Sequence, residues 1–179
     1  MIDRDKKELR KQIKEVKKKY SFEEKKVKSI KIFETLEKLP EFAKSRIVMA
    51  YWSMDDEVNT HDFILKWYPE KRFVLPSVKG DELELREFTG TQSMSAGSSF
   101  GISEPIKLYT DSVENIDLVV VPGVAFDNNK NRLGRGKAYY DKLLKGTKAF
   151  KVGVCFDFQF VEHVPTNEFD VKMDCVVTN

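Results

Sequence analysis

A glycine-rich segment, PGVAFDNNKNRLGRGKAYYDKLL at residues 122–144, carries the residue types best suited to bind phosphate. Gly134 and Gly136 allow a ligand to approach the backbone closely, and a predicted helix begins just after them. The cations beside these glycines are Arg132, Arg135 and Lys137. The segment matches neither G-x-x-x-x-G-K-[ST] nor a complete G-x-G-x-x-G. It is therefore either a different phosphate-binding loop or a two-glycine turn with solvated basic residues.

Two aspartates could bring oxygen ligands for a metal ion to the same place. Asp141 lies four residues after Lys137, and Asp170 follows the strand predicted to end at Phe156. Two carboxylates with phosphate oxygens and water suit Mg²⁺. The alternative is that Asp141 is a surface residue or pairs with Lys137 or Lys145. Rings that could stack on a planar heterocycle, or simply belong to the core, are those of Trp52, Phe126, Tyr139 and Tyr140.

The beginning of the sequence is strongly basic. The first 31 residues hold 13 basic and 6 acidic ones, and the remainder has a net charge of −5 because 18 basic residues face 23 acidic ones. Lys6 and Arg10 lie one helical turn apart and could hold one anion together. Nucleic-acid binding is an alternative, but no interleaved aromatic residues accompany the charge, which favours a solvated helix surface.

Residues 1–40 are predicted to form two helices. The first has an apolar face made of Leu9, Ile13, Val16 and Tyr20. Ser21 and Glu24 form a capping-box pattern at the start of the second helix. The side chains expected to point inward from that helix are Val27, Ile30 and Phe33.

Strands alternate with helices in the rest of the sequence. Strands are predicted over residues 47–51, 72–76, 82–88, 115–121, 152–156 and 171–178, with helices after a Thr60 cap and over 138–145. Residues 90–101 (GTQSMSAGSSFG) show no period and predict a loop, of which 93–99 could order as a lid. This alternation predicts an α/β fold whose mostly parallel sheet is covered on both faces, with ligands beyond the carboxyl ends of its strands.

Length and composition favour one domain, residues 1–179. The chain has 41% hydrophobic and 34% charged residues, which suits a globular protein with a real core. No apolar run is long enough for a membrane helix, and the first residues lack a secretory signal, so a cytoplasmic location is expected. Cys155 and Cys175 lack disulfide or zinc spacing and are predicted to be buried in strands. His61 and His163 are interpreted as structural because no nucleophile accompanies either.

Ordered motifs along the chain give a family resemblance. The segments NIDLVVV, PGVAFD and NRLGRGKAYYD, followed by TNEFDVKMD, are similar to those of 5-formyltetrahydrofolate cyclo-ligases, also called 5,10-methenyltetrahydrofolate synthetases. KKELR resembles the family's K-x-x-L-R, YWSMDDEVNT its Y-x-S-M-x-x-E-[IV]-x-T, and FGISEP its G-I-x-E-P. The resemblance implies a three-layer α/β/α sandwich related to sugar-phosphate isomerases and CoA transferases.

The resemblance also implies a reaction. Cyclo-ligases use ATP and Mg²⁺ to convert 5-formyltetrahydrofolate into 5,10-methenyltetrahydrofolate, releasing ADP and phosphate. The γ-phosphoryl group is transferred to the formyl oxygen, N10 attacks the formyl carbon, and phosphate leaves. We expect a monomer whose only partners are small molecules, including a folate that can be polyglutamylated, and neither nucleic acid nor membrane.

Carried over position by position, the resemblance assigns the site residues. Those matching the ATP-binding positions are Lys6, Lys7, Glu8, Leu9, Arg10, Arg132, Leu133, Gly134, Arg135, Gly136, Lys137, Ala138, Tyr139 and Tyr140. Those matching the folate-binding positions are Trp52, Met54, Glu57, Arg135, Gly136, Lys137, Ala138 and Tyr139. Arg135, Lys137 and Tyr139 are the expected catalytic residues, and Asp141 and Asp170 the expected metal ligands. Family members often have glycine at the position of Ala138.

Two other classes remain as alternatives. A phosphosugar isomerase or CoA-transferase-like enzyme on the same fold would use the cationic loop without hydrolysing ATP. A nucleic-acid-binding protein would use the lysine-rich first helices, and its binding would weaken steeply with salt.

Overall fold

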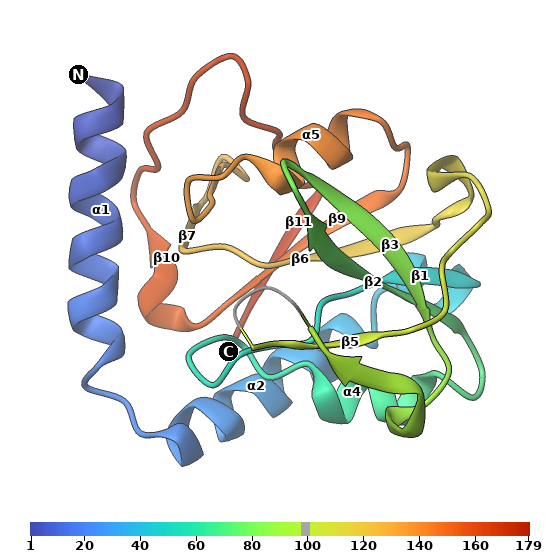
Figure 1. Ribbon diagram of the computed structural model, residues 1–179. Coiled ribbons are helices and arrows are strands. Elements are labelled where there is room, and N and C mark those ends of the chain that lie inside the picture. The colour runs from blue at the N-terminus through green and yellow to red at the C-terminus, as the bar shows by residue number, and fades with distance from the viewer. Residues whose placement is uncertain (98–100) are drawn as a thin grey trace.

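A six-stranded sheet forms the centre of the computed structural model, which describes residues 1–97 and 101–179 (Figure 1). Its strands, in spatial order, are β11 (Cys175–Thr178), β9 (Phe150–Cys155), β6 (Leu118–Val121), β1 (Ile47–Met49), β2 (Arg72–Lys79) and β3 (Glu82–Phe88). Neighbouring strands are parallel except for the β2–β3 pair, which is antiparallel. The prediction of a mostly parallel sheet is confirmed.

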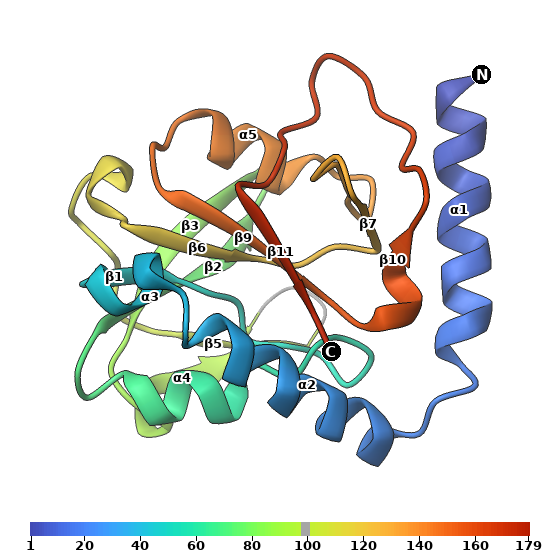
Figure 2. The same ribbon diagram turned by 180° about the vertical axis from the view of Figure 1, so that it is seen from behind.

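Helices cover both faces of this sheet (Figures 1 and 2). On one face lie α2 (Phe22–Leu36), α3 (Pro40–Lys44) and α4 (His61–Trp67), and on the other lies α5 (Tyr139–Lys145). Each face has its own apolar cluster, one built around Ile32, Phe42 and Ile64 and the other around Phe126 and Leu144. Because β6 is buried along its whole length between the two clusters, its sequence is a continuous apolar run.

Helix α1 (Ile2–Lys17) runs along the side of the molecule, next to β7 and β10 (Figure 1). Its apolar attachment to the body is centred on Ile13, which packs in a small cluster with Ala125, Leu133 and Val164. This agrees with the predicted apolar face. The outward lysines of the helix lie in solvent, as expected for a solvated surface.

Helix α2 begins with the predicted capping box, in which Ser21 and Glu24 each accept the other's backbone N–H. The predicted inward face is confirmed for Phe33 but was wrong for Val27 and Ile30, which are 56% and 48% exposed. The buried face instead consists of Ser29, Ile32, Phe33 and Leu36. A search for apolar residues misses this face because it includes a serine. The Ser29 hydroxyl can be buried because it donates a hydrogen bond to the Lys25 carbonyl and accepts one from the Asn59 N–H.

Several shorter elements complete the fold. A small sheet contains β7 (Ala125–Asp127), β8 (Arg132–Leu133) and β10 (Phe160–Val161), and a hairpin contains β4 (Met94–Ala96) and β5 (Ser103–Pro105). Single 3-10 turns are η1 (Thr91–Ser93), η2 (Val113–Asn115) and η3 (Asp157–Gln159). Among the described residues, no helix combines the length and apolarity needed to cross a membrane.

Two sequence predictions need correction here. The segment 90–101 is not all loop, since 91–93 form η1 and 94–96 form β4. The suggested lid over 93–99 includes residues 98–99, and the FGISEP motif begins at residue 100; these three positions lie outside the described residues. The last strand begins at Cys175 rather than at Val171, because the Val171 N–H donates to the Asp141 carboxylate instead of joining the sheet.

Candidate active site

A cavity of about 940 Å³ lies at the carboxyl ends of β1 and β6. Tyr51 and Trp52, just after β1, and Pro122 and Gly123, just after β6, border it. The chain leaves β1 toward β2 on one side, whereas β6 continues toward β9 on the other. Parallel α/β sheets bind ligands where neighbouring strands diverge in this way, so the cavity stands at the expected edge of the sheet.

The glycine loop, residues 134–138, connects β8 to α5 and borders this cavity. Gly136 has φ +105°, a conformation that other residues rarely adopt. Arg10 holds the loop from α1, since its Nε donates to the Gly134 carbonyl at 2.9 Å. Ala138, the N-cap of α5, has φ 56° and ψ 15°, so it is left-handed although it is not glycine. Such a conformation costs an L-residue roughly 1 kcal/mol, which explains why glycine suits this position.

The cations of this region differ in exposure. Arg132 is buried, and its Nη1 and Nη2 donate to the Pro122 carbonyl at 3.0 Å and to Asp141 Oδ2 at 3.1 Å. Burial lowers the pKa of the Arg132 guanidinium, although Asp141 opposes this. Lys137 is exposed and has no hydrogen bond or ion pair within the described part of the chain. Lys137 is therefore free to meet a phosphate group, whereas Arg132 supports the wall behind it.

The two candidate metal ligands border the same cavity. Asp141 accepts the Val171 N–H at 3.1 Å in addition to Arg132, so the alternative partners Lys137 and Lys145 are not the ones it uses. Asp170 accepts the Asn167 N–H at 2.7 Å and pairs with Lys6 Nζ at 2.5 Å. The described residues contain no group of three or more metal-binding side chains. Two carboxylates fit Mg²⁺ when phosphate oxygens and water complete the shell, which is how this ion is usually bound.

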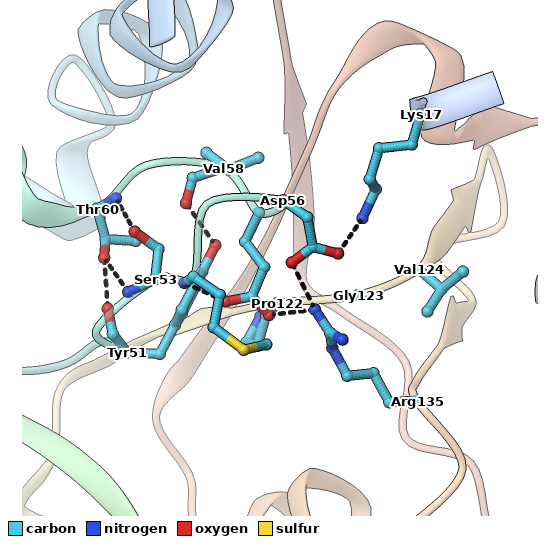
Figure 3. Close-up of polar contacts among 12 residues, drawn as sticks. Lys17, Tyr51, Ser53, Asp56, Val58, Thr60, Pro122, Gly123, Val124 and Arg135 are labelled. Atoms are coloured by element: carbon cyan, nitrogen blue, oxygen red, sulfur yellow. Dashed lines mark hydrogen bonds and ion pairs between the residues drawn. The ribbon is translucent and has the colours of Figure 1, made fainter. Parts of the chain in front are cut away.

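Hydrogen bonds within residues 51–60 fix the loop after β1 (Figure 3). Thr60 does not cap α4 through its side chain as predicted. Its Oγ1 instead donates to the Tyr51 carbonyl at 2.5 Å and accepts the Ser53 N–H, while Ser53 Oγ accepts the Thr60 N–H. The Tyr51 hydroxyl donates to the Val58 carbonyl at 3.2 Å. These bonds hold in place the segment that carries Trp52, Met54 and Glu57 at the cavity.

Arg135 crosses from the glycine loop to this 51–60 loop. Its Nη2 donates to Asp56 Oδ1 at 3.2 Å and to Glu57 Oε1 at 2.9 Å, and Lys17 from α1 contacts Asp56 Oδ2 at 3.3 Å (Figure 3). Although burial alone raises the pKa of Asp56, the Lys17 and Arg135 charges lower it below its usual value. Burial likewise lowers the pKa of Arg135, but Glu57 and Asp56 outweigh it and raise that pKa. Both shifts favour the charged forms of Asp56 and Arg135.

The cavity also has an apolar wall, to which Trp52 belongs. Trp52 stacks on His61 with ring centroids 3.9 Å apart and on Phe88 at 5.6 Å, which gives His61 a structural role. Further apolar lining residues, which the sequence analysis missed, are Pro76, Val78, Leu83, Ile102 and Phe169. The alternation of charged and apolar residues over 82–88 predicts a half-exposed strand, but it does not show that Leu83 meets a ligand.

Most of the residues expected at the site border the cavity, but some do not. Glu8 and Leu9 are outside its lining: Leu9 packs on the Ile13 cluster, and Glu8 is exposed. Phe126 is fully buried, and its ring fills the space that side chains at Gly123 and Gly153 would need. It therefore belongs to the core and not to a ligand platform. Tyr139 borders the cavity, and its hydroxyl donates to the Gly80 carbonyl at 3.2 Å.

The cavity is thus lined by both cationic and apolar side chains, at the carboxyl edge of a mostly parallel sheet. This combination is typical of α/β enzymes that bring a phosphorylated compound against a largely apolar substrate. A family model described as the 5-formyltetrahydrofolate cyclo-ligase family matches residues 2–179. The chain belongs to this family.

Individual relatives agree with the family match. A probable 5-formyltetrahydrofolate cyclo-ligase of Schizosaccharomyces pombe is 34% identical over 170 residues, which cover 84% of this chain and 83% of the relative. The NMR structure of Aquifex aeolicus 5,10-methenyltetrahydrofolate synthetase has a TM-score of 0.86 and 39% identity, covering 97% of this chain and 89% of that one. The corresponding Mycoplasma pneumoniae structure has a TM-score of 0.78 and 26% identity, covering 97% and 98%.

Proposed function

We propose that this protein uses ATP to cyclise 5-formyltetrahydrofolate to 5,10-methenyltetrahydrofolate, with release of ADP and phosphate, and that residues 1–179 act as one domain. The observation that carries the proposal is the position of Lys137 and Arg135, which border the same cavity as the Trp52 wall. A phosphoryl donor and a flat, partly apolar acceptor can therefore meet there. The family to which the chain belongs supports the same reaction.

The reaction needs charge stabilisation more than a strong base. The formyl oxygen becomes a leaving group once it takes the γ-phosphoryl group and ADP departs. N10 then attacks the formyl carbon, loses its proton, and phosphate leaves as the ring closes. Lys137 and Arg135 would stabilise the charge on the phosphoryl oxygens, and Tyr139 would position the group between the two ligands.

Asp141 and Asp170 would hold Mg²⁺ together with the phosphates, and the ion would neutralise part of the phosphate charge. Lys6 now neutralises Asp170, and Arg132 neutralises Asp141. Both carboxylates keep further lone pairs for the ion. Lys6 and Arg10, which border the cavity from α1, would contact the nucleotide.

The folate would lie along the apolar wall. Trp52, whose ring is held in place by His61, borders the cavity together with Met54 of the same loop. The Glu57 carboxylate accepts hydrogen bonds from the Met54 N–H and from Arg135 Nη2. It can accept further hydrogen bonds from the N–H groups of a pterin. Three further points stay predictions. A comparison of folates with different glutamate chains tests the polyglutamate preference, size-exclusion chromatography tests the monomeric state, and cell fractionation tests the cytoplasmic location.

The direct test is spectrophotometric detection of methenyltetrahydrofolate from 5-formyltetrahydrofolate, with and without ATP and with Mg²⁺ or EDTA. We expect product only with ATP and Mg²⁺, together with one ADP for each product molecule. Product without ADP would favour the isomerase or transferase alternative. A folded protein that binds ATP but forms no product would show that the acceptor is a different compound.

A further inference from the structure

Asp56 lies where the carboxyl end of α1, the 51–60 loop and the glycine loop meet (Figure 3). Its two oxygens are used separately: Oδ1 accepts from Arg135 Nη2 at 3.2 Å and Oδ2 from Lys17 Nζ at 3.3 Å. The Lys17 side chain is 15% exposed, whereas that of Asp56 is 47% exposed. Asp56 is therefore the group through which α1 reaches Arg135.

The contacts of Arg135 leave part of its guanidinium available. Asp56 and Glu57 both accept from the same nitrogen, Nη2. Within the described residues, Nη1 and Nε of Arg135 have no hydrogen-bond partner. Because the guanidinium is planar and rigid, two carboxylates that hold one nitrogen also set the direction of the others. The free N–H groups are thus oriented without being occupied.

Charge balance explains the presence of Lys17. Asp56 and Glu57 together carry two negative charges beside one arginine, an arrangement that would repel an anionic ligand. Lys17 supplies the second positive charge, so the four groups are neutral together. An anion then meets the free side of Arg135 without net repulsion from this cluster.

We propose that Asp56 is a positioning residue that aims Arg135 at the transferred phosphoryl group, and that Lys17 balances its charge from α1. This inference rests on the proposed role of Arg135. It assigns to α1 a second function, separate from nucleotide contact by Lys6 and Arg10: the carboxyl end of the helix helps to set the geometry of the glycine loop.

Asp56→Asn and Asp55→Asn form a matched pair, because each removes one negative charge from neighbouring positions. Asp55 is exposed and makes no hydrogen bond or ion pair with the described residues. We expect Asp56→Asn to lower kcat about tenfold, with an unchanged melting temperature and no increase in KM for ATP, because an orientation used in the transition state is lost. Asp56→Glu should recover part of kcat, and Asp55→Asn should match wild type.

The charge balance has its own matched pair. Lys17→Gln leaves the cluster with a net negative charge and should raise KM for ATP about threefold, an effect that shrinks in high salt. Lys14→Gln removes a charge from the exposed face of the same helix and should leave KM unchanged. Equal effects of the two variants would contradict a specific role of Lys17.

Arg135→Gln separates this inference from the proposed site. If Asp56 acts through Arg135, adding Asp56→Asn to Arg135→Gln lowers kcat no further. A second, independent loss in the double variant, or a normal kcat for Asp56→Asn beside a low kcat for Arg135→Gln, would overturn the inference alone. Normal turnover of Arg135→Gln would instead overturn the proposed role of Arg135, and the inference with it.

Discussion

At the scale of single residues, the loop between β8 and α5 shows that neighbouring cations have different tasks. Arg132 is buried and paired, whereas Lys137 is exposed and without a partner among the described residues. An unpaired cation beside a cavity can stabilise the transition state of phosphoryl transfer strongly, because it gives up no protein contact when it binds the phosphate.

Lys137→Ala should therefore lower kcat by about a hundredfold or more, since it removes charge stabilisation from the transition state. The melting temperature should not change, because the side chain is exposed and supports no described contact. The measurement is methenyltetrahydrofolate formation at saturating ATP. Lys148→Ala, another exposed lysine, serves as the control. A near-normal kcat would remove Lys137 from the site.

Asp141 combines a proposed metal role with a structural one. Asp141 is an expected metal ligand, and it is also the charge partner of an Arg132 side chain that is 4% exposed. Asp141→Ala should both abolish turnover and reduce the free energy of unfolding by about 3 kcal/mol, because it leaves a buried charge unpaired.

Denaturant unfolding measures the stability loss at Asp141, and the cyclisation assay measures turnover. The matched variant is Arg132→Met with Asp141→Ala, which removes the buried charge as well. The double variant should regain stability but not activity. Equal stability of Asp141→Ala and wild type would contradict the importance of this pair.

At the scale of elements, α1 makes polar contacts with the candidate site and its neighbouring loop along its length. Lys6 pairs with Asp170, Arg10 with the Gly134 carbonyl, and Lys17 with Asp56. Its apolar attachment is small and centred on Ile13. The helix is thus placed as much by polar contacts with the site as by its core contacts, which couples its position to bound ligands.

Arg10→Ala should raise KM for ATP about tenfold with a smaller change in kcat, because a contact remote from the reacting atoms contributes equally to ground and transition states. Steady-state kinetics with varied ATP and saturating folate measure this. Lys11→Ala, one position away and exposed, should have no effect. If Arg10→Ala lowers kcat instead, its bond to Gly134 matters more than its contact with the nucleotide.

At the scale of the whole molecule, Asp127 connects separate segments and should shape stability in acid. It is 1% exposed and accepts four N–H groups, from Asn129, from the backbone and side chain of Asn131, and from Val164. Burial alone raises the pKa of Asp127, but these hydrogen bonds lower it below its usual value of 3.8. A carboxyl whose pKa is lower in the folded state stabilises the fold above its unfolded-state pKa, and this contribution disappears as pH falls through the folded pKa.

Asp127→Asn should therefore reduce the free energy of unfolding by about 2 kcal/mol at pH 7. It should also make this free energy less dependent on pH below about pH 4, where the wild-type carboxylate becomes protonated. Urea unfolding between pH 2 and 7 measures both effects. Glu162→Gln, at an exposed position two residues before Val164, is the control. An unchanged acid slope in Asp127→Asn would show that other carboxylates dominate.

The sequence by itself determined the class of fold, the two N-terminal helices and the residues of the glycine loop, because these depend on local pattern. Hydrophobic periodicity and capping act over a few residues, and the ordered motifs are visible without coordinates. The same local logic failed at α2, where it chose Val27 and Ile30 as inward residues. A single sequence does not show which face of a helix packs against the sheet.

Only the tertiary structure decided how the candidate site residues are used. It paired Asp141 with Arg132 and Asp170 with Lys6, placed Phe126 in the core, and brought Asp56 between Lys17 and Arg135. These pairs are separated in sequence by up to 164 residues. Charge pairing and packing over such separations depend on the order of the strands in the sheet. That order is set by the path of the whole chain and not by any local segment.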